Sequence, residues 1–227
     1  QEEVNLFIDN LLTVMTEKGY QGVDIDFEYI LAEDRDAFTD FVWQVAERMR
    51  ANGYHTSVAL APKTSADQKG VLYEGKDYRA LGAAADHVLL MTYEWGYTYG
   101  PPMAVAPLNQ VRRVVEYAVT EVPPQKIDLG IPNYGYDWPL PFVRGETMAT
   151  SIGNIQAVRI AIEQDAPIQF ADVAQSPFFT YLQAGNNAPQ SGGGNTIAVP
   201  EDIAVVEHEV WFEDVRSLQG KFDLIRE

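Results

Sequence analysis

The sequence predicts an α/β protein in which helices alternate with the strands of a parallel sheet. Short apolar or alternating segments recur at about residues 22–29, 55–61, 87–93 and 127–132, and stretches with helical periodicity separate them. The chain has 227 residues, 46% of them hydrophobic, which is enough for one large domain or two small ones with a true core. Strands connected through helices are typical of a parallel sheet, which can be open or closed into a barrel.

The first elements follow from the spacing of apolar residues. Residues 1–18 have the apolar spacing of one buried helix face, and Gly19 ends this helix. Residues 22–29 alternate strictly and predict a strand. A second amphipathic helix is expected from about residue 34 to 49, ended by Asn52 and Gly53. Its inward positions are Phe38, Phe41, Val42, Val45 and Met49.

The same alternation continues along the chain. Strands are expected at residues 55–61, 87–93 and 127–132, with helices at 78–85 and 107–119 between them. A strand at 205–212 and a helix from about 214 to the end follow later. We count five framework strands. A barrel of eight would need three more, so either the sheet is open or the chain is a piece of a longer protein.

The pattern changes between residues 145 and 200. A helix is expected at 155–163, a strand at 178–182, and a flexible loop at 185–195, which is rich in Gly and Asn. We interpret residues 145–204 as a small α+β insertion. Residues 1–144 are then a barrel portion, and residues 205–227 return to the barrel.

Charge and composition exclude several function classes. The 16 Lys and Arg against 33 Asp and Glu give a net charge of −17, which disfavours nucleic acid and anionic lipid surfaces. Apolar runs such as 88–91 are far too short to span a bilayer. Without cysteine there is no disulfide or thiolate site, and the three histidines are isolated, so we expect no metal and no cofactor.

The segment 22–29 carries the most informative pattern. Alternate strand residues point to opposite faces, which puts the apolar side chains on one face and three carboxylates on the other. Same-face neighbours lie ~6.8 Å apart, so in a poorly solvated pocket at least one carboxyl should keep its proton. Two alternatives remain, a solvated acidic edge strand and a divalent-cation site of the glycosyltransferase kind. The acidic trio is Asp24, Asp26 and Glu28.

These residues resemble a known family, the chitinase-like glycoside hydrolases of family 18. Residues 21–28 are similar to its D-x-x-D-x-D-x-E signature, with Gln21 in place of the first Asp. Residues 91–94 (MTYE) are similar to its M-x-Y-D, with Glu in place of Asp, and residues 130–135 (GIPNYG) to its G-x-P-x-Y-G. The longer phrases at 91–108 and 130–142 most resemble bacterial N-acetylglucosaminidases that degrade spore cortex or peptidoglycan.

The resemblance implies a (β/α)8 TIM barrel. This chain would cover roughly strands four to seven and the last helix, with the α+β insertion after strand seven. Strands one to three would precede Gln1, and strand eight would follow Glu227. The site would lie at the carboxyl ends of the strands, as in barrel enzymes generally. Because open edges leave backbone groups unpaired, we expect the 227 residues alone to be inactive.

The resemblance also implies a retaining mechanism in which the substrate's own 2-acetamido oxygen is the nucleophile. Glu28 would protonate the leaving oxygen, Asp26 would orient the acetamido N–H, and Asp24 would share a proton with Asp26. Tyr134 would donate to the acetamido oxygen. Further candidates for substrate binding are Met91, Tyr93, Glu94, Trp95, Asn133 and Trp138, with Tyr97 and Tyr99 as additional stacking rings. Each of these aromatic rings could instead be plain core or loop packing.

Two hypotheses of different class follow. The first is a glycosidase that cleaves β-1,4 bonds in N-acetylglucosamine-containing polysaccharide, either peptidoglycan of the spore cortex or a chitin-like oligomer. The second is a non-catalytic glycan-binding relative, which the presence of Glu28 disfavours because such proteins usually replace the acid. We expect a monomer that is extracellular or associated with a bacterial cell wall or spore.

Overall fold

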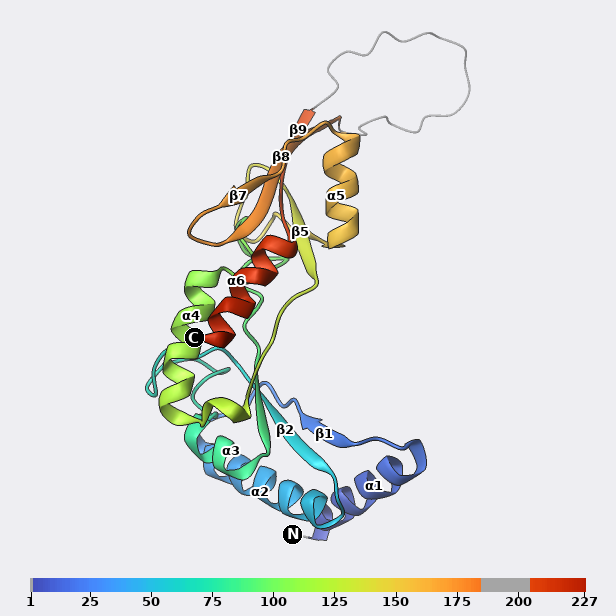
Figure 1. Cartoon of the computed structure of the whole chain (residues 1–227), viewed down its shortest axis with the longest axis vertical. Coiled ribbons are helices and arrows are strands. Elements are labelled where there is room, and N and C mark those ends of the chain that lie inside the picture. Colours follow the sequence, from blue (N-terminus) through green and yellow to red (C-terminus); the bar gives the residue numbers. More distant parts are fainter. Residues whose placement is uncertain (1, 185–204) are drawn as a thin grey trace. The chain divides into compact units, whose positions relative to one another are not determined.

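The computed structural model describes residues 2–184 and 205–227, and these form two compact units (Figure 1). The first comprises Gln1–Thr92 and Gln110–Ile131, and the second Tyr93–Asn109 and Pro132–Glu227. The loop predicted at 185–195 lies outside the described residues. The candidate residues are divided between the units, so each unit is described by itself.

The first unit is built on a four-stranded parallel sheet. Its strands are β1 (Gly22–Ile25), β2 (His55–Leu60), β3 (His87–Leu90) and β4 (Ile127–Leu129), paired in that order. Four of the five predicted framework strands are therefore confirmed as parallel neighbours. Among the described residues β1 pairs with β2 alone, which makes it an edge strand.

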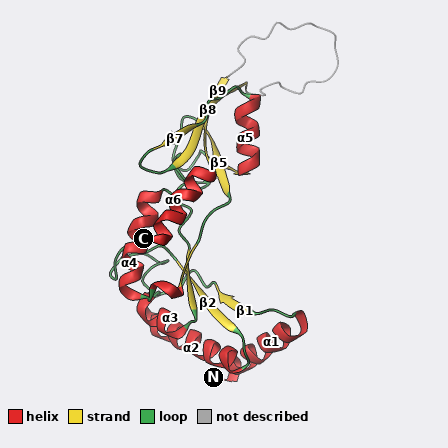
Figure 2. Cartoon of the chain, viewed as in Figure 1, coloured by secondary structure: helices red, strands yellow, loops and turns green. Residues whose placement is uncertain are grey.

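Helices connect these strands (Figure 2). Helix α1 (Glu2–Lys18) precedes β1. The connecting helices are α2 (Arg35–Ala51) after the short 3₁₀ turn η1 (Ala32–Asp34), α3 (Tyr78–Ala84) and α4 (Leu108–Glu121), which is followed by η2 (Pro124–Lys126). Because crossovers between parallel neighbours are right-handed, successive helices pack on the same face of the sheet. Of the α2 side chains predicted to face inward, Phe41 is half-buried and the other four are buried, namely Phe38, Val42, Val45 and Met49.

The second unit is a five-stranded antiparallel sheet in the order β6-β5-β9-β8-β7. The strands are β5 (Tyr134–Pro139), β6 (Thr150–Gly153), β7 (Gln169–Ala171), β8 (Ser176–Ala184) and β9 (Val205–Trp211). Helices α5 (Asn154–Glu163) and α6 (Val215–Arg226) belong to this unit. Ala157 and Ala161 of α5 pack into a core with Ile152, Phe179 and Val210.

Two expectations about the strands were wrong. The segment 205–212 is not a framework strand, because β9 pairs antiparallel with β5 and β8 of the second sheet. Its alternation is equally compatible with either sheet, so periodicity could not identify its partners. The strand predicted at 22–29 ends at Ile25, so Asp26 and Glu28 follow β1 rather than lie within it. No helix in the described residues is both long and apolar enough to cross a membrane.

Candidate functional site

The acidic trio lies on and just beyond the edge strand of the first unit. Asp24 is opposite Ser57 in the β1–β2 register, and the Ser57 hydroxyl donates a hydrogen bond to the Asp24 carboxylate. Phe27 stacks on Phe38 and Phe41 of α2, with ring centroids 6.0 Å and 5.6 Å apart. This contact turns the Phe27 ring toward the helix.

The expected enclosed pocket around the trio is not present in the described residues. Asp24, Asp26 and Glu28 are all exposed. The physical reason is the position of β1, which has a hydrogen-bonded neighbour on one side only in the part of the chain that the structure describes. Nothing in this unit therefore excludes water from the carboxylates.

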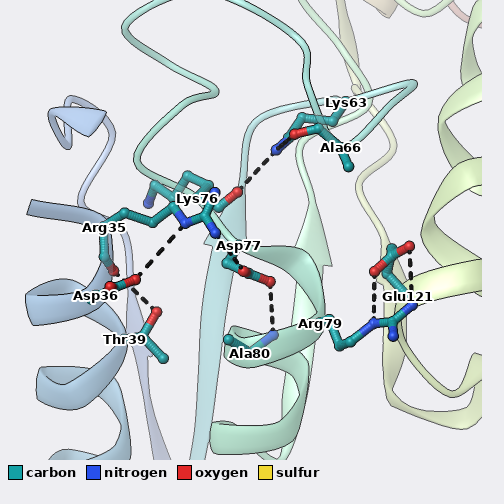
Figure 3. A network of polar contacts seen from close by, with 10 residues as sticks. All are labelled: Arg35, Asp36, Thr39, Lys63, Ala66, Lys76, Asp77, Arg79, Ala80 and Glu121. Carbon is teal, nitrogen blue, oxygen red and sulfur yellow. Dashed lines mark hydrogen bonds and ion pairs between the residues drawn. The ribbon is translucent and has the colours of Figure 1, made fainter. Parts of the chain in front are cut away.

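A buried lysine lies beside the trio. Lys76 is 1% exposed, and its ammonium group donates to the backbone carbonyl of Phe27, between Asp26 and Glu28. Burial lowers the pKa of Lys76 to about 8, against the opposing effect of the charges on Asp26, Glu28 and Asp24. The backbone carbonyl of Lys76 in turn accepts from the ammonium of Lys63, as Figure 3 shows.

The second unit holds a different cluster, centred on Glu94. The Tyr134 hydroxyl donates to its Oε1 over 2.6 Å, and the Tyr136 hydroxyl reaches the two oxygens at 3.0 and 3.2 Å. Burial first, and then the Glu94 hydrogen bond and charge, raise the pKa of both tyrosines, which keeps them protonated as donors. Tyr93 is half-buried against the same core cluster as Tyr136.

Glu94 has a strained backbone. Its φ of +66° lies in the left-handed region, which residues with a β-carbon rarely adopt. On its C-terminal side, Trp95 and Gly96 donate their N–H groups to the carbonyls of Val105 and Ala104, both over 3.0 Å. The surrounding turn and the two tyrosines thus hold the carboxylate in one place.

The remaining aromatic candidates differ in how deeply they are buried. Tyr97 and Tyr99 are 40% and 61% exposed, and their rings meet edge to face at 6.3 Å. Trp95 is half-buried. Trp138 is fully buried and its indole N–H donates to the Gly100 carbonyl over 2.8 Å, so its rings are core packing and not a stacking platform for a sugar.

The last two candidates are Met91, from the motif at residues 91–94, and Asn133, from the motif at residues 130–135. Met91 is half-buried in the first unit, where its N–H donates to the Leu60 carbonyl over 3.0 Å and extends the pairing of β2 with β3. Asn133 is an exposed residue directly before β5 in the second unit.

Sequence reasoning missed two residues of these clusters. Tyr136 could have been found, since it lies two residues after Tyr134 and therefore on the same face of β5. Lys76 carries no such signal, because a lone lysine in the polar stretch 74–77 looks like a solvated loop residue.

These features define a class of protein, an α/β protein whose first unit has carboxylates at the carboxyl end of a parallel strand and whose second unit groups tyrosines around a further carboxylate. The model of the family described as glycosyl hydrolases family 18 matches residues 1–227, and the chain belongs to this family. The resemblance expected from the three motifs is confirmed. The family and its solved chitinases imply a TIM-barrel-like α/β fold, although the described residues do not form a closed barrel.

Relatives and solved structures agree with this family. The chain is 46% identical to the cortical fragment-lytic enzyme of Bacillus subtilis (strain 168) over 92% of its own length and 44% of that protein. It is 40% identical to the spore cortex-lytic enzyme SleL of Bacillus cereus, with a TM-score of 0.85, covering 98% of this chain and 47% of that one. A chitinase of Chromobacterium violaceum matches at 26% identity and a TM-score of 0.80, covering 96% of this chain and 62% of that one. The chain thus spans about half the length of the curated relatives it matches.

Proposed function

We propose that this chain carries the catalytic residues of a glycosidase that cleaves β-1,4 bonds in N-acetylglucosamine-containing glycans, with spore-cortex peptidoglycan as the first candidate substrate. The observation that carries the proposal is the sequence Asp24-x-Asp26-x-Glu28 at the end of a parallel strand in a family 18 chain. The naming of the relatives as cortex-lytic enzymes favours peptidoglycan over chitin.

The proposed reaction is substrate-assisted and retaining. Glu28 gives its proton to the glycosidic oxygen as the bond from that oxygen to the anomeric carbon breaks. The acetamido oxygen of the same sugar forms a bond to the anomeric carbon, which yields an oxazolinium ion. Water then attacks that carbon from the face of the departed group as the bond from the carbon to the acetamido oxygen breaks, and the water gives a proton to the Glu28 carboxylate, which restores the acid.

The other residues orient the reacting sugar. Asp26 accepts from the acetamido N–H and balances the positive charge of the intermediate, and Asp24, held by the Ser57 hydroxyl, shares a proton with Asp26. Tyr134 donates to the acetamido oxygen, which requires its hydroxyl to turn from Glu94 to the substrate.

The remaining contacts concern the walls of the subsite. We assign Met91, Tyr93, Glu94 and Asn133 to the lining, and Trp95, with the exposed rings of Tyr97 and Tyr99, to contacts with sugar faces.

For the fold, we propose that β1–β4 are four consecutive strands of a (β/α)8 barrel, strands four to seven in the family's order. The antiparallel sheet of the second unit then corresponds to the α+β insertion. In such a barrel β1 would gain a second neighbour, and the trio would become enclosed. We further propose that the protein acts outside the cell, on the wall or the spore, as a monomer.

The test is Glu28→Gln in the full-length protein, which removes the proton donor and keeps the shape of the side chain. We expect hydrolysis of purified peptidoglycan to fall by about 10³-fold or more, since general acid catalysis contributes on this scale, with glycan binding retained. Glu33→Gln, the same change at an exposed acid of η1, is the matched control and should leave turnover unchanged.

Mass spectrometry of the new reducing end reports which bond is cut, and chitooligosaccharide assayed in parallel separates the two substrate classes. Near wild-type turnover in Glu28→Gln would refute the assignment of the acid. Binding of glycan without cleavage by the wild-type protein would instead favour the glycan-binding hypothesis.

A further inference from the structure

The loop that follows β2 carries two buried lysines, and neither is paired with a carboxylate within the part of the chain that the structure describes. Lys63 is 2% exposed, and its ammonium donates to the carbonyls of Ala66 at 3.2 Å and Lys76 at 3.0 Å (Figure 3). Lys76 donates to the carbonyls of Phe27 and, at 3.5 Å, Ala59 of β2. Both ammonium groups therefore bind main chain.

These contacts join the loop to the segment that carries the proposed acid. Lys63 fixes the backbone of Lys76, and the Lys76 ammonium fixes the backbone of Phe27. Gly75 is pressed against the same segment, since a β-carbon there would lie 2.1 Å from the Ile30 carbonyl oxygen. The Lys76 ammonium also lies 4.4 Å from the centroid of the Phe38 ring, on which Phe27 stacks.

A buried cation without an ionic partner is costly, because its desolvation is only partly offset by bonds to neutral carbonyls. A methionine would fill the same space without that cost. The cost of the buried ammonium therefore indicates that its charge has a function. The charged groups that act on Lys76 are Asp26, Glu28 and Asp24 of the segment after β1. On the other sides lie Lys63 of its own loop and Asp77, which is paired with Arg35 of α2 at 3.1 Å.

We propose that Lys76 is a positioning residue for the acidic trio, whose buried ammonium fixes the main chain between Asp26 and Glu28 and offsets the negative charge left when Glu28 gives up its proton. The inference rests on the proposed function. In the first step of the reaction a neutral carboxylic acid becomes a carboxylate beside two aspartates, and a fixed positive charge at the adjoining carbonyl lowers the cost of that step.

The experiment compares Lys76→Met with Lys76→Arg in the full-length protein. Loss of the charge should lower kcat about 10-fold or more with little change in KM, since the charge matters most after proton transfer. The pH profile of kcat/KM should move upward by about one unit in Lys76→Met, because an adjacent cation favours ionised carboxylates. Lys76→Arg, which keeps a positive charge, should recover most of kcat and the wild-type profile.

A second comparison, between wild type and Lys76→Arg at high pH, does not depend on the methionine variant. Because the pKa of Lys76 is about 8, the wild-type protein should lose rate above that pH as the ammonium deprotonates. The guanidinium of Lys76→Arg stays charged there, so that variant should keep its rate to higher pH. Lys69→Met is the matched control, an exposed lysine of the same loop paired with Glu74, and should leave every readout unchanged.

Amide hydrogen exchange at residues 26–30 gives a readout that needs no substrate, and we expect it to be at least 10-fold faster in Lys76→Met. Wild-type kcat, profile and exchange in that variant would overturn the inference. A lower kcat with an unmoved profile and unchanged exchange would also overturn it, since that result indicates packing alone. Turnover by Glu28→Gln is a separate outcome, which refutes the proposed function and leaves the exchange result to decide the role of Lys76.

Discussion

Lys221→Met should destabilise the second unit severely, because it removes the cation from a buried ion pair. The Lys221 ammonium lies 2.8 Å from Oε2 of Glu213, and both side chains are 1% exposed. Burial raises the pKa of Glu213, and the charge of Lys221 and its hydrogen bond act in the opposite direction. The variant would therefore keep a carboxyl in the core with nothing to compensate its charge. We expect a loss of about 3–5 kcal/mol in the free energy of unfolding.

Thermal unfolding followed by circular dichroism and tryptophan fluorescence measures this loss, which corresponds to a midpoint lower by roughly 10 °C. Lys221→Met combined with Glu213→Leu should recover most of the stability, since it removes both charges. The second carboxylate oxygen of Glu213 has no hydrogen-bond partner in the described residues. Replacing both residues of the pair should therefore cost little free energy of unfolding. Arg226→Met, which breaks an exposed pair with Asp223, is the control and should change little.

The loss of stability in Lys221→Met should depend on pH in a defined direction. A carboxyl whose pKa is raised by folding binds more protons in the native state than in the unfolded state, so its contribution to stability falls as the pH rises from the unfolded toward the native pKa. Without Lys221 the native pKa of Glu213 rises further. The stability deficit of Lys221→Met relative to wild type should therefore shrink as the pH falls toward 4.5, the ordinary value for this side chain. A single variant as stable as wild type, or a double variant as unstable as the single, would refute the reasoning.

Two further predictions concern β5. Tyr136→Phe removes a donor at 3.0 Å from the Glu94 carboxylate and should lower kcat/KM about 10-fold, whereas the exposed Tyr20→Phe should not; equal kinetics of the two would argue against a role for Tyr136. Gly135→Ala would place a β-carbon 2.2 Å from the Trp211 carbonyl oxygen and should lower the unfolding midpoint, while Gly153→Ala meets nothing within 4 Å and should not; matching midpoints would contradict the packing argument.

Much of the fold could be predicted because it depends on patterns among residues close together in the sequence. The apolar spacing of α1 and α2, the alternation through β1 and the glycine stops depend only on residues close in the chain, and the structure has these elements within a few residues of the expected bounds. The three motifs, read as sequence, were sufficient to indicate the family. The apolar position expected at Phe27 is likewise confirmed on the side of α2, as the ring contacts with Phe38 and Phe41 show.

Other features depend on parts of the chain that are far apart in sequence. The partners of β9, the burial of Lys76, the core position of Trp138 and the pairing of Tyr136 with Glu94 all involve segments tens of residues away. Residue spacing describes which face a side chain takes on its own element, but it does not describe which element covers that face. The sequence by itself thus determined the four parallel strands, the helices, the acidic trio and the family. The tertiary structure alone decided which charges are buried and which strands pair, because burial and long-range pairing are properties of the packed chain.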